Sequence, residues 1–122
     1  ANEYFQKAGS LRLEYYNPKT RQNYQRIKDI LTQRGITLVC VQYPMRSIGS
    51  LKKLFQDTKG IIFVDNEKIF KEAVRKFSYE ECFTDRFAGE FGHCTSRGNR
   101  LLAENIAKVI LKECFNKYSK LR

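Results

Sequence analysis

The residues best suited to acid–base chemistry in this chain lie in the segment 89–104. It contains His93, the only histidine of the protein, and Glu90 stands three positions before it. A neutral imidazole can take up and return a proton near pH 7. A nearby carboxylate can fix the tautomer of the ring and stabilise the imidazolium. The pattern therefore predicts His93 as a catalytic base and Glu90 as the acid that orients it.

A nucleophile that would complete this pair is hard to identify. Cys94 follows His93 directly, but the side chains of adjacent residues point apart, so we do not assign a thiol nucleophile. The four cysteines include no C-x-x-C pair, which argues against a structural zinc site. We assign no metal and no cofactor. Cys40 lies in an apolar run and Cys114 in a predicted helix, and both are interpreted as buried thiols. A disulfide between Cys82 and Cys94 stays open.

The length and composition suit one α/β domain over residues 1–122. No apolar run approaches the roughly 20 residues of a membrane span, so none is predicted.

The net charge of +10 is high for this length, but Lys and Arg are spread over every segment. A solvated basic surface is the simplest interpretation, and anionic substrates or nucleic acid are alternative partners. Nucleic acid is the least favoured partner, because zinc-finger spacing, RNP-like motifs and basic heptads are absent. The redox compartment and cellular location stay open.

The first half of the chain carries clear signals for helices and a strand. Asn-Pro at 17–18 predicts the start of a helix, and Gly35 predicts its end. The apolar, β-branched run 36–43 predicts a strand buried on both faces, as in a parallel sheet. Ser47 or Ser50 can cap a short helix that follows this strand.

The second half continues the same alternation. A second buried strand is predicted at 61–64, followed by a helix from about Asn66. Ser78 opens a capping-box pattern for one further helical turn. The loop 84–95 then carries His93, and Ser96 is predicted to cap the last helix.

Helices that alternate with buried strands predict an α/β layered fold with a parallel sheet. The strands at 36–43 and 61–64 are clear, and 11–16 is a weaker third. A sheet this small would leave long unpaired edges, which proteins rarely tolerate. We therefore expect an incomplete sheet, completed by preceding sequence or by a second chain or copy.

The His93 segment carries a longer pattern than a lone histidine. Glu-Phe-Gly-His at 90–93 is followed by Thr95, by Gly-Asn at 98–99 and by Leu-Leu-Ala-Glu-Asn-Ile-Ala at 101–107. This pattern resembles the final block of the SGNH hydrolases, also called GDSL esterases. Segments 28–44 and 61–65 are similar to the βα unit and the strand that precede that block. The resemblance covers about the last 100 residues of the chain.

The resemblance implies a flavodoxin-like three-layer α/β/α sandwich with a parallel sheet. It also implies ester hydrolysis through a Ser nucleophile, a His base and an acidic residue. By position His93 is the base and Glu90 takes the acidic place. The family usually has Asp at that place, and Asp85 is the nearest alternative acid.

The nucleophile block of the family, Gly-Asp-Ser, does not occur in this chain, and neither does its Gly-x-Asn-Asp motif. Gly-Ser at 9–10 is an approximate match, and no buried strand precedes it. We therefore expect the C-terminal portion of an SGNH hydrolase that is inactive alone, with the nucleophile and oxyanion donors before Ala1. The substrate would be an O-acyl carbohydrate or a small lipid ester.

Two other functions stay open, a non-catalytic α/β binding or assembly module and a basic nucleic-acid-binding protein. Arg46 is interpreted as a surface charge, with a contact to an anionic substrate group as the alternative. A set of aromatic residues is expected to fill the core, with an acyl pocket as the alternative: Tyr15, Tyr16, Phe83, Phe87 and Phe91.

Overall fold

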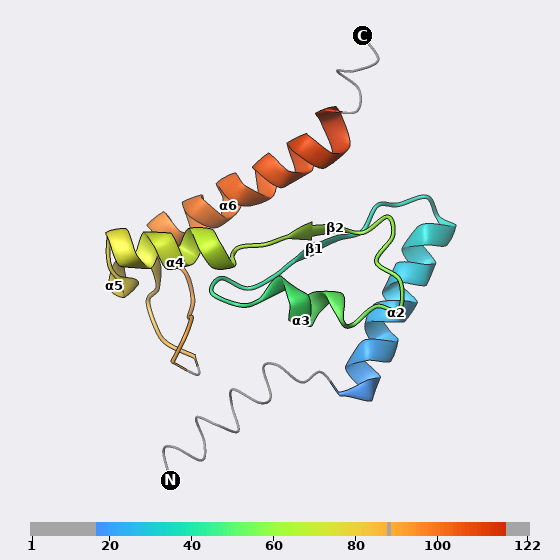
Figure 1. Ribbon diagram of the computed structural model, residues 1–122, viewed down its shortest axis with the longest axis horizontal. Helices are drawn as coiled ribbons and strands as arrows, with labels where there is room; N and C mark the ends of the chain where they lie inside the picture. The colour runs from blue at the N-terminus through green and yellow to red at the C-terminus, as the bar shows by residue number, and fades with distance from the viewer. Residues whose placement is uncertain (1–16, 88, 117–122) are drawn as a thin grey trace.

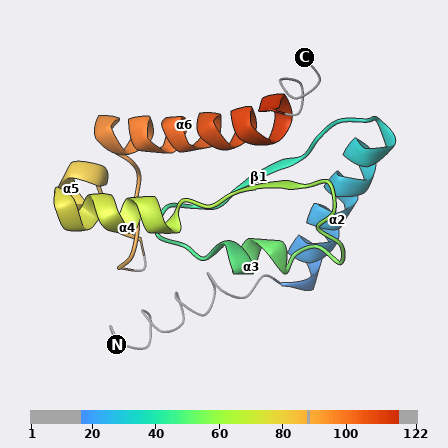
Figure 2. The ribbon, with the colours of Figure 1, turned by 45° about the horizontal axis from the view of Figure 1, so that its top comes forward.

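The computed structural model describes residues 17–87 and 89–116, and Figure 1 shows their arrangement. Two short parallel strands run through the middle of the molecule. Figures 1 and 2 agree that the long helix α6 lies on one side of these strands and α3 on the other. The strand predicted at 11–16, Ser10 and the two tyrosines at 15–16 lie outside the described residues.

Helix α2 spans Pro18–Gln33, as the Asn-Pro signal predicts. The Asn17 side chain accepts a hydrogen bond from the Thr20 amide at 2.8 Å, which satisfies one of the free N–H groups of the first turn. The chain leaves the helix through Gly35, whose φ of 67° is a left-handed conformation that favours glycine. Both ends of the predicted helix are thus confirmed.

Strand β1 spans Val39–Val41 and strand β2 spans Ile62–Val64. They pair in parallel with Cys40 opposite Phe63, which confirms the predicted direction. The prediction of a first strand buried on both faces is wrong, because the residue Val41 is 41% exposed. Cys40 faces the first core, whereas the opposite face, which carries Val41, is only partly covered by the described residues.

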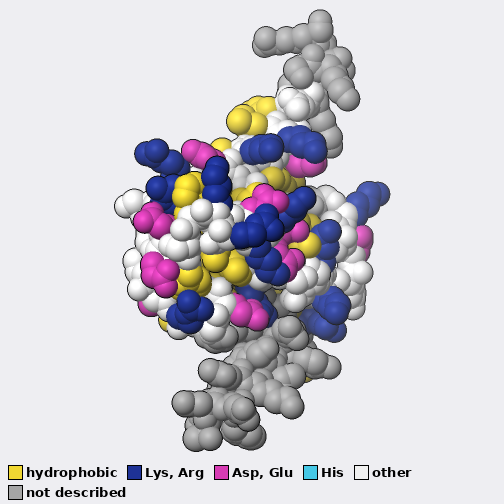
Figure 3. All heavy atoms as spheres, turned by 60° about the vertical axis from the view of Figure 1, so that its left-hand side comes forward, with side chains coloured by type: hydrophobic (Ala, Val, Ile, Leu, Met, Phe, Trp, Pro, Cys, Tyr) yellow, Lys and Arg dark blue, Asp and Glu magenta, His cyan; other side chains and the backbone are white. Residues whose placement is uncertain are grey.

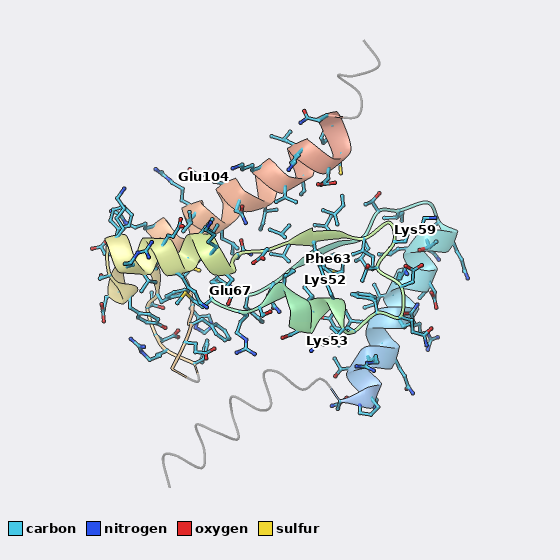
Figure 4. All side chains as sticks on the ribbon, in the orientation of Figure 1. Lys52, Lys53, Lys59, Phe63, Glu67 and Glu104 are labelled. Carbon is cyan, nitrogen blue, oxygen red and sulfur yellow. The ribbon has the colours of Figure 1, made fainter. Side chains whose placement is uncertain are left out.

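The first core lies between α2, α3 and the strands. Helix α3 spans Ile48–Lys52 and is capped by the Ser47 hydroxyl, which accepts from the Gly49 amide. Residues on and after this helix pack against β1, and they are joined by aromatic contacts from α2 and β2: Cys40, Leu51, Leu54, Phe55, Tyr24 and Phe63. The Lys52 ammonium lies 5.5 Å from the centre of the Phe63 ring (Figure 4), a cation–π contact at the edge of this core.

The second core lies under the last helices. Helix α4 spans Glu67–Lys76, α5 spans Tyr79–Cys82, and α6 spans Ser96–Ile110 and continues as the π-helical turn η1, Leu111–Phe115. Four buried side chains form its centre: Phe70, Cys82, Phe83 and Phe91. Ser78 caps α5 as predicted. The predicted cap of the last helix is wrong by one residue, because Thr95 accepts from the Gly98 amide.

Two side-chain amides, the buried Asn66 and the partly buried Asn105, join the carboxyl ends of both strands to α6. The Asn66 side chain is fully buried and donates to the Gln42 carbonyl at 2.8 Å. The Asn105 amide donates to Asn66 Oδ1 at 2.8 Å and to the Asp65 carbonyl at 2.9 Å. Buried polar groups that are all paired specify one arrangement, so these bonds fix α6 against the strand ends.

The fold is mixed α/β with a two-stranded parallel sheet. The three-layer flavodoxin-like sandwich remains a prediction. No helix in the described part of the chain has the length and apolar content that crossing a bilayer requires. On the face shown in Figure 3, Lys and Arg side chains are interspersed with acidic and apolar ones.

Candidate active site

His93 lies in a hairpin that connects α5 to α6. We call residues 83–87 and 89–94 the His93 hairpin; in Figure 1 it lies beneath α4 and α5. Single antiparallel bridges pair Phe83 with Cys94 and Phe87 with Phe91. Between them, the Thr84 amide donates to the His93 carbonyl at 2.8 Å. The hairpin therefore brings residues on its first arm opposite His93.

Asp85 is the carboxylate that faces His93. Its Oδ2 lies 2.5 Å from His93 Nδ1, and its Oδ1 accepts from the His93 backbone amide at 2.6 Å. These two bonds lower the pKa of Asp85, the ring bond being the larger cause. Because an ionised carboxylate can only accept, Nδ1 must carry the proton of the neutral ring. Asp85 therefore fixes both the tautomer and the direction of the imidazole.

The opposite edge of the imidazole is open. The His93 side chain is 71% exposed, and within the described residues its Nε2 makes no hydrogen bond. The Phe87 ring meets the imidazole edge-on, with centroids 4.8 Å apart. With Nδ1 protonated, Nε2 carries the free lone pair, so this arrangement can accept a proton from a hydroxyl group placed beside it.

Glu90 lies in the same hairpin but its carboxylate is bound elsewhere. Glu90 Oε2 accepts from Arg46 at 2.9 Å, and the Arg46 side chain is only 8% exposed. The interpretation of Arg46 as a surface charge is therefore wrong. The burial arises because the turn after β1 packs against the hairpin, 44 residues along the chain, and no local pattern marks that contact. The structure brings His93 together with Asp85, the alternative acid, and Glu90 together with Arg46.

The cysteines supply no activated thiol beside His93. All four lie among the described residues and are free thiols, so Cys82 and Cys94 are not joined. Burial raises the pKa of the Cys94 thiol, and the nearby Cys82 raises it further. Because the thiolate is the nucleophilic form, this environment disfavours attack by Cys94.

The remaining predicted residues are placed as follows. Phe83 and Phe91 are buried in the second core, as predicted, while Phe87 stays partly exposed beside His93. Ser47 is a helix cap, as predicted. No group of three or more potential metal ligands occurs within residues 17–87 and 89–116.

Comparison with known proteins gives no relative for this chain. No protein-family model, no curated protein and no solved structure matches it.

The Asp85–His93 pair should make stability depend on pH in acid. The pKa of Asp85 is lower in the folded chain, so the unfolded chain binds more protons as the pH falls. The stabilisation is complete well above the ordinary Asp value of about 3.9 and disappears as the pH falls through the lowered value. Thermal midpoints measured from pH 6 to 2 should fall more steeply below about pH 4 in the wild type than in Asp85→Asn.

His93→Ala is a second variant that tests the same pair from its other side. It removes the ring donor and keeps the Asp85 carboxylate, so it should flatten the acid slope in the same direction as Asp85→Asn. Equal slopes in the wild type and both variants would show that the pair does not form in solution.

Proposed function

We propose that this chain belongs to an SGNH-type ester hydrolase that works through a Ser-His-acid mechanism and an acyl-enzyme, with the serine supplied from outside these 122 residues. One observation carries the proposal. Asp85 holds Nδ1 of His93 while Nε2 stays open, which is the arrangement that a general base needs.

In this mechanism each step moves one proton through His93. As the serine oxygen attacks the ester carbonyl, Nε2 takes the serine proton and Asp85 stabilises the imidazolium. The imidazolium then protonates the leaving alcohol, which departs and leaves an acyl-serine. Water attacks the acyl-serine in the same way, and the acid and the free serine are released. Asp85 thus takes the acidic role for which the family resemblance suggests Glu90.

The position of the hairpin also supports the proposal. The turn that follows β1 contacts the hairpin through Arg46 and Tyr43, so the His93 hairpin lies near the carboxyl end of a parallel strand. Ligands in α/β sheets bind at this end. An O-acyl carbohydrate and a small lipid ester both fit a mechanism that acts on an exposed ester.

The proposal is tested by comparing the 122-residue chain with the full product of its gene. Both are treated with a fluorophosphonate serine probe and assayed with short-chain p-nitrophenyl esters. We expect the chain alone to be inert and the full product to be labelled at one serine and to hydrolyse the esters. Stoichiometric labelling of a serine within the 122 residues would show that the active site is misplaced here.

The absence of a Gly-Asp-Ser block in the 122 residues favours a second candidate, a non-catalytic module that keeps the fold. The same experiment separates the two functions. A full product that neither reacts with the probe nor hydrolyses esters would favour the module.

The proposal includes a second chain, a second copy or a further segment that completes the sheet. Exposed apolar side chains on and beside β1 support it, since Ile36 is 52% and Val41 is 41% exposed. We expect the isolated chain to self-associate, with a mass above 14.4 kDa by light scattering. A monodisperse monomer at about millimolar concentration would contradict this expectation.

A further inference from the structure

The ion pair between Arg46 and Glu90 joins two segments that lie far apart in the sequence. Arg46 ends the turn that follows β1, and Glu90 lies three residues before His93. The guanidinium is buried, whereas the Glu90 carboxylate is half exposed. A buried charge that lost its partner would be strongly disfavoured, so Arg46 holds Glu90 in place.

The turn that carries Arg46 is itself fixed by hydrogen bonds. The Arg46 amide donates to the Tyr43 carbonyl at 3.2 Å, and Met45 between them has a φ of 69°, which is rare for a residue with a side chain. Inside the turn, the buried Gln42 side chain donates to the Ser47 carbonyl at 2.8 Å and accepts from the Tyr43 amide at 2.9 Å. Such a turn provides a fixed point from which Arg46 can act.

A second contact ties the same turn to the same hairpin. The Tyr43 ring stacks on Phe91 with centroids 5.2 Å apart and an angle of 23° between the rings. Phe91 stands between Glu90 and the pair Gly92-His93. Two neighbouring residues of the hairpin are therefore held from outside, directly before the backbone reaches His93.

We propose that Arg46 is a positioning residue, which through Glu90 holds the His93 hairpin so that Asp85 keeps Nδ1 and Nε2 stays open. The role of Arg46 in catalysis rests on the proposed esterase function. Arg46 itself touches neither substrate nor His93 in this assignment. We call the ion pair between Arg46 and Glu90 the clamp. Asp85 is the direct partner of the ring.

The test reads the tautomer of His93 without any substrate. Because His93 is the only histidine, a ¹H–¹⁵N spectrum of the 122-residue chain contains a single imidazole. At a pH where the ring is neutral, the wild type should show the Nδ1–H tautomer. Arg46→Gln and Glu90→Gln should each shift the ring to the Nε2–H tautomer, which a free histidine prefers in water.

A control and a second readout separate the clamp from simple charge effects. Glu67→Gln removes the same charge from a surface pair with Lys71 on α4, and it should leave the tautomer unchanged. The pKa of Asp85, followed by carbon NMR, provides the second readout. Simple charge removal would raise that pKa in Arg46→Gln and lower it in Glu90→Gln. Loosening of the clamp raises it in both variants, because both weaken the bonds from His93.

If Arg46→Gln fails to fold by circular dichroism, Arg46→Met, an apolar replacement of similar length, takes its place. The proposal is overturned if folded variants keep the Nδ1–H tautomer, or if the pKa of Asp85 moves in opposite directions in the two variants. The failure of the esterase proposal would appear separately, as an inert full gene product whose His93 tautomer still responds to the clamp variants.

Discussion

In the complete form of the proposed esterase, His93→Ala should lower kcat about 10³-fold or more and change the melting temperature by less than about 5 °C. The loss in kcat follows because the ring is the only group assigned to move the serine proton, and its removal also leaves the nucleophile unoriented. The small effect on stability follows because the ring is 71% exposed and fills no core position.

Two companion variants make this prediction specific. Asp85→Asn keeps the size of the side chain but lets the amide nitrogen face Nδ1, so the ring would adopt the wrong tautomer and kcat should fall steeply. Glu90→Gln should cost less, because it weakens the contact of Asp85 with Nδ1 through the position of the hairpin but leaves the Asp85 carboxylate in place. Matched steady-state kinetics on the complete enzyme measure all three variants.

The opposite order of effects would identify a different acid. If Glu90→Gln lowers kcat more than Asp85→Asn, then Glu90 is the orienting residue and the pairing with Asp85 is not the catalytic one. If His93→Ala keeps most of its kcat, the esterase function is wrong, and the non-catalytic module becomes the better account.

The helix starts were predictable because their signals are local. Asn17, Ser47 and Ser78 each bond to an amide two or three residues further on, so a sequence window of one turn contains the whole interaction. The cap of α6 was misassigned because Thr95 and Ser96 are both able to cap, and the hairpin decides between them. Thr95 is held there because its hydroxyl also donates to the Glu81 carbonyl at 2.5 Å.

The length and burial of the strands could not be predicted, because both depend on neighbours that are distant in the chain. The apolar run 36–43 suits a central strand, but three of its residues pair with β2 and its ends are exposed. An apolar run reports what a segment is able to bury and not what covers it.

The sequence predicts Glu90 as the partner of His93 and Asp85 only as the alternative, for a similar reason. Spacing alone favours the residue three positions away, whereas the register of the hairpin brings together residues eight positions apart. Arg46 was missed as a structural residue because its partner is 44 residues away, and a single arginine after a turn is usually a surface charge. Both cases depend on how the hairpin folds, which no local signal in the sequence specifies.

Gly92→Ala should disrupt the site although it replaces none of the residues assigned to catalysis. A Cβ at position 92 would overlap the Asp85 carbonyl oxygen and approach Asp85 Oδ1. The obstacle is backbone, so the hairpin arms must separate, and His93 would move away from Asp85. We expect a loss of about 1–3 kcal/mol in the free energy of unfolding. We also expect a fall of about 10²-fold or more in kcat of the complete enzyme, because small displacements of a catalytic group are costly.

Gly60→Ala is the matched control, because it makes the same chemical change far from the hairpin. Gly60 has a φ of 79°, and a Cβ there would meet no other group within 4 Å. The left-handed backbone alone should cost about 1–2 kcal/mol of stability, with kcat unchanged. The two variants thus have similar costs in folding, but only Gly92→Ala should lower kcat. A Gly92→Ala enzyme with full kcat and the Nδ1–H tautomer would show that the close approach of Asp85 to the His93 arm is not what holds the base.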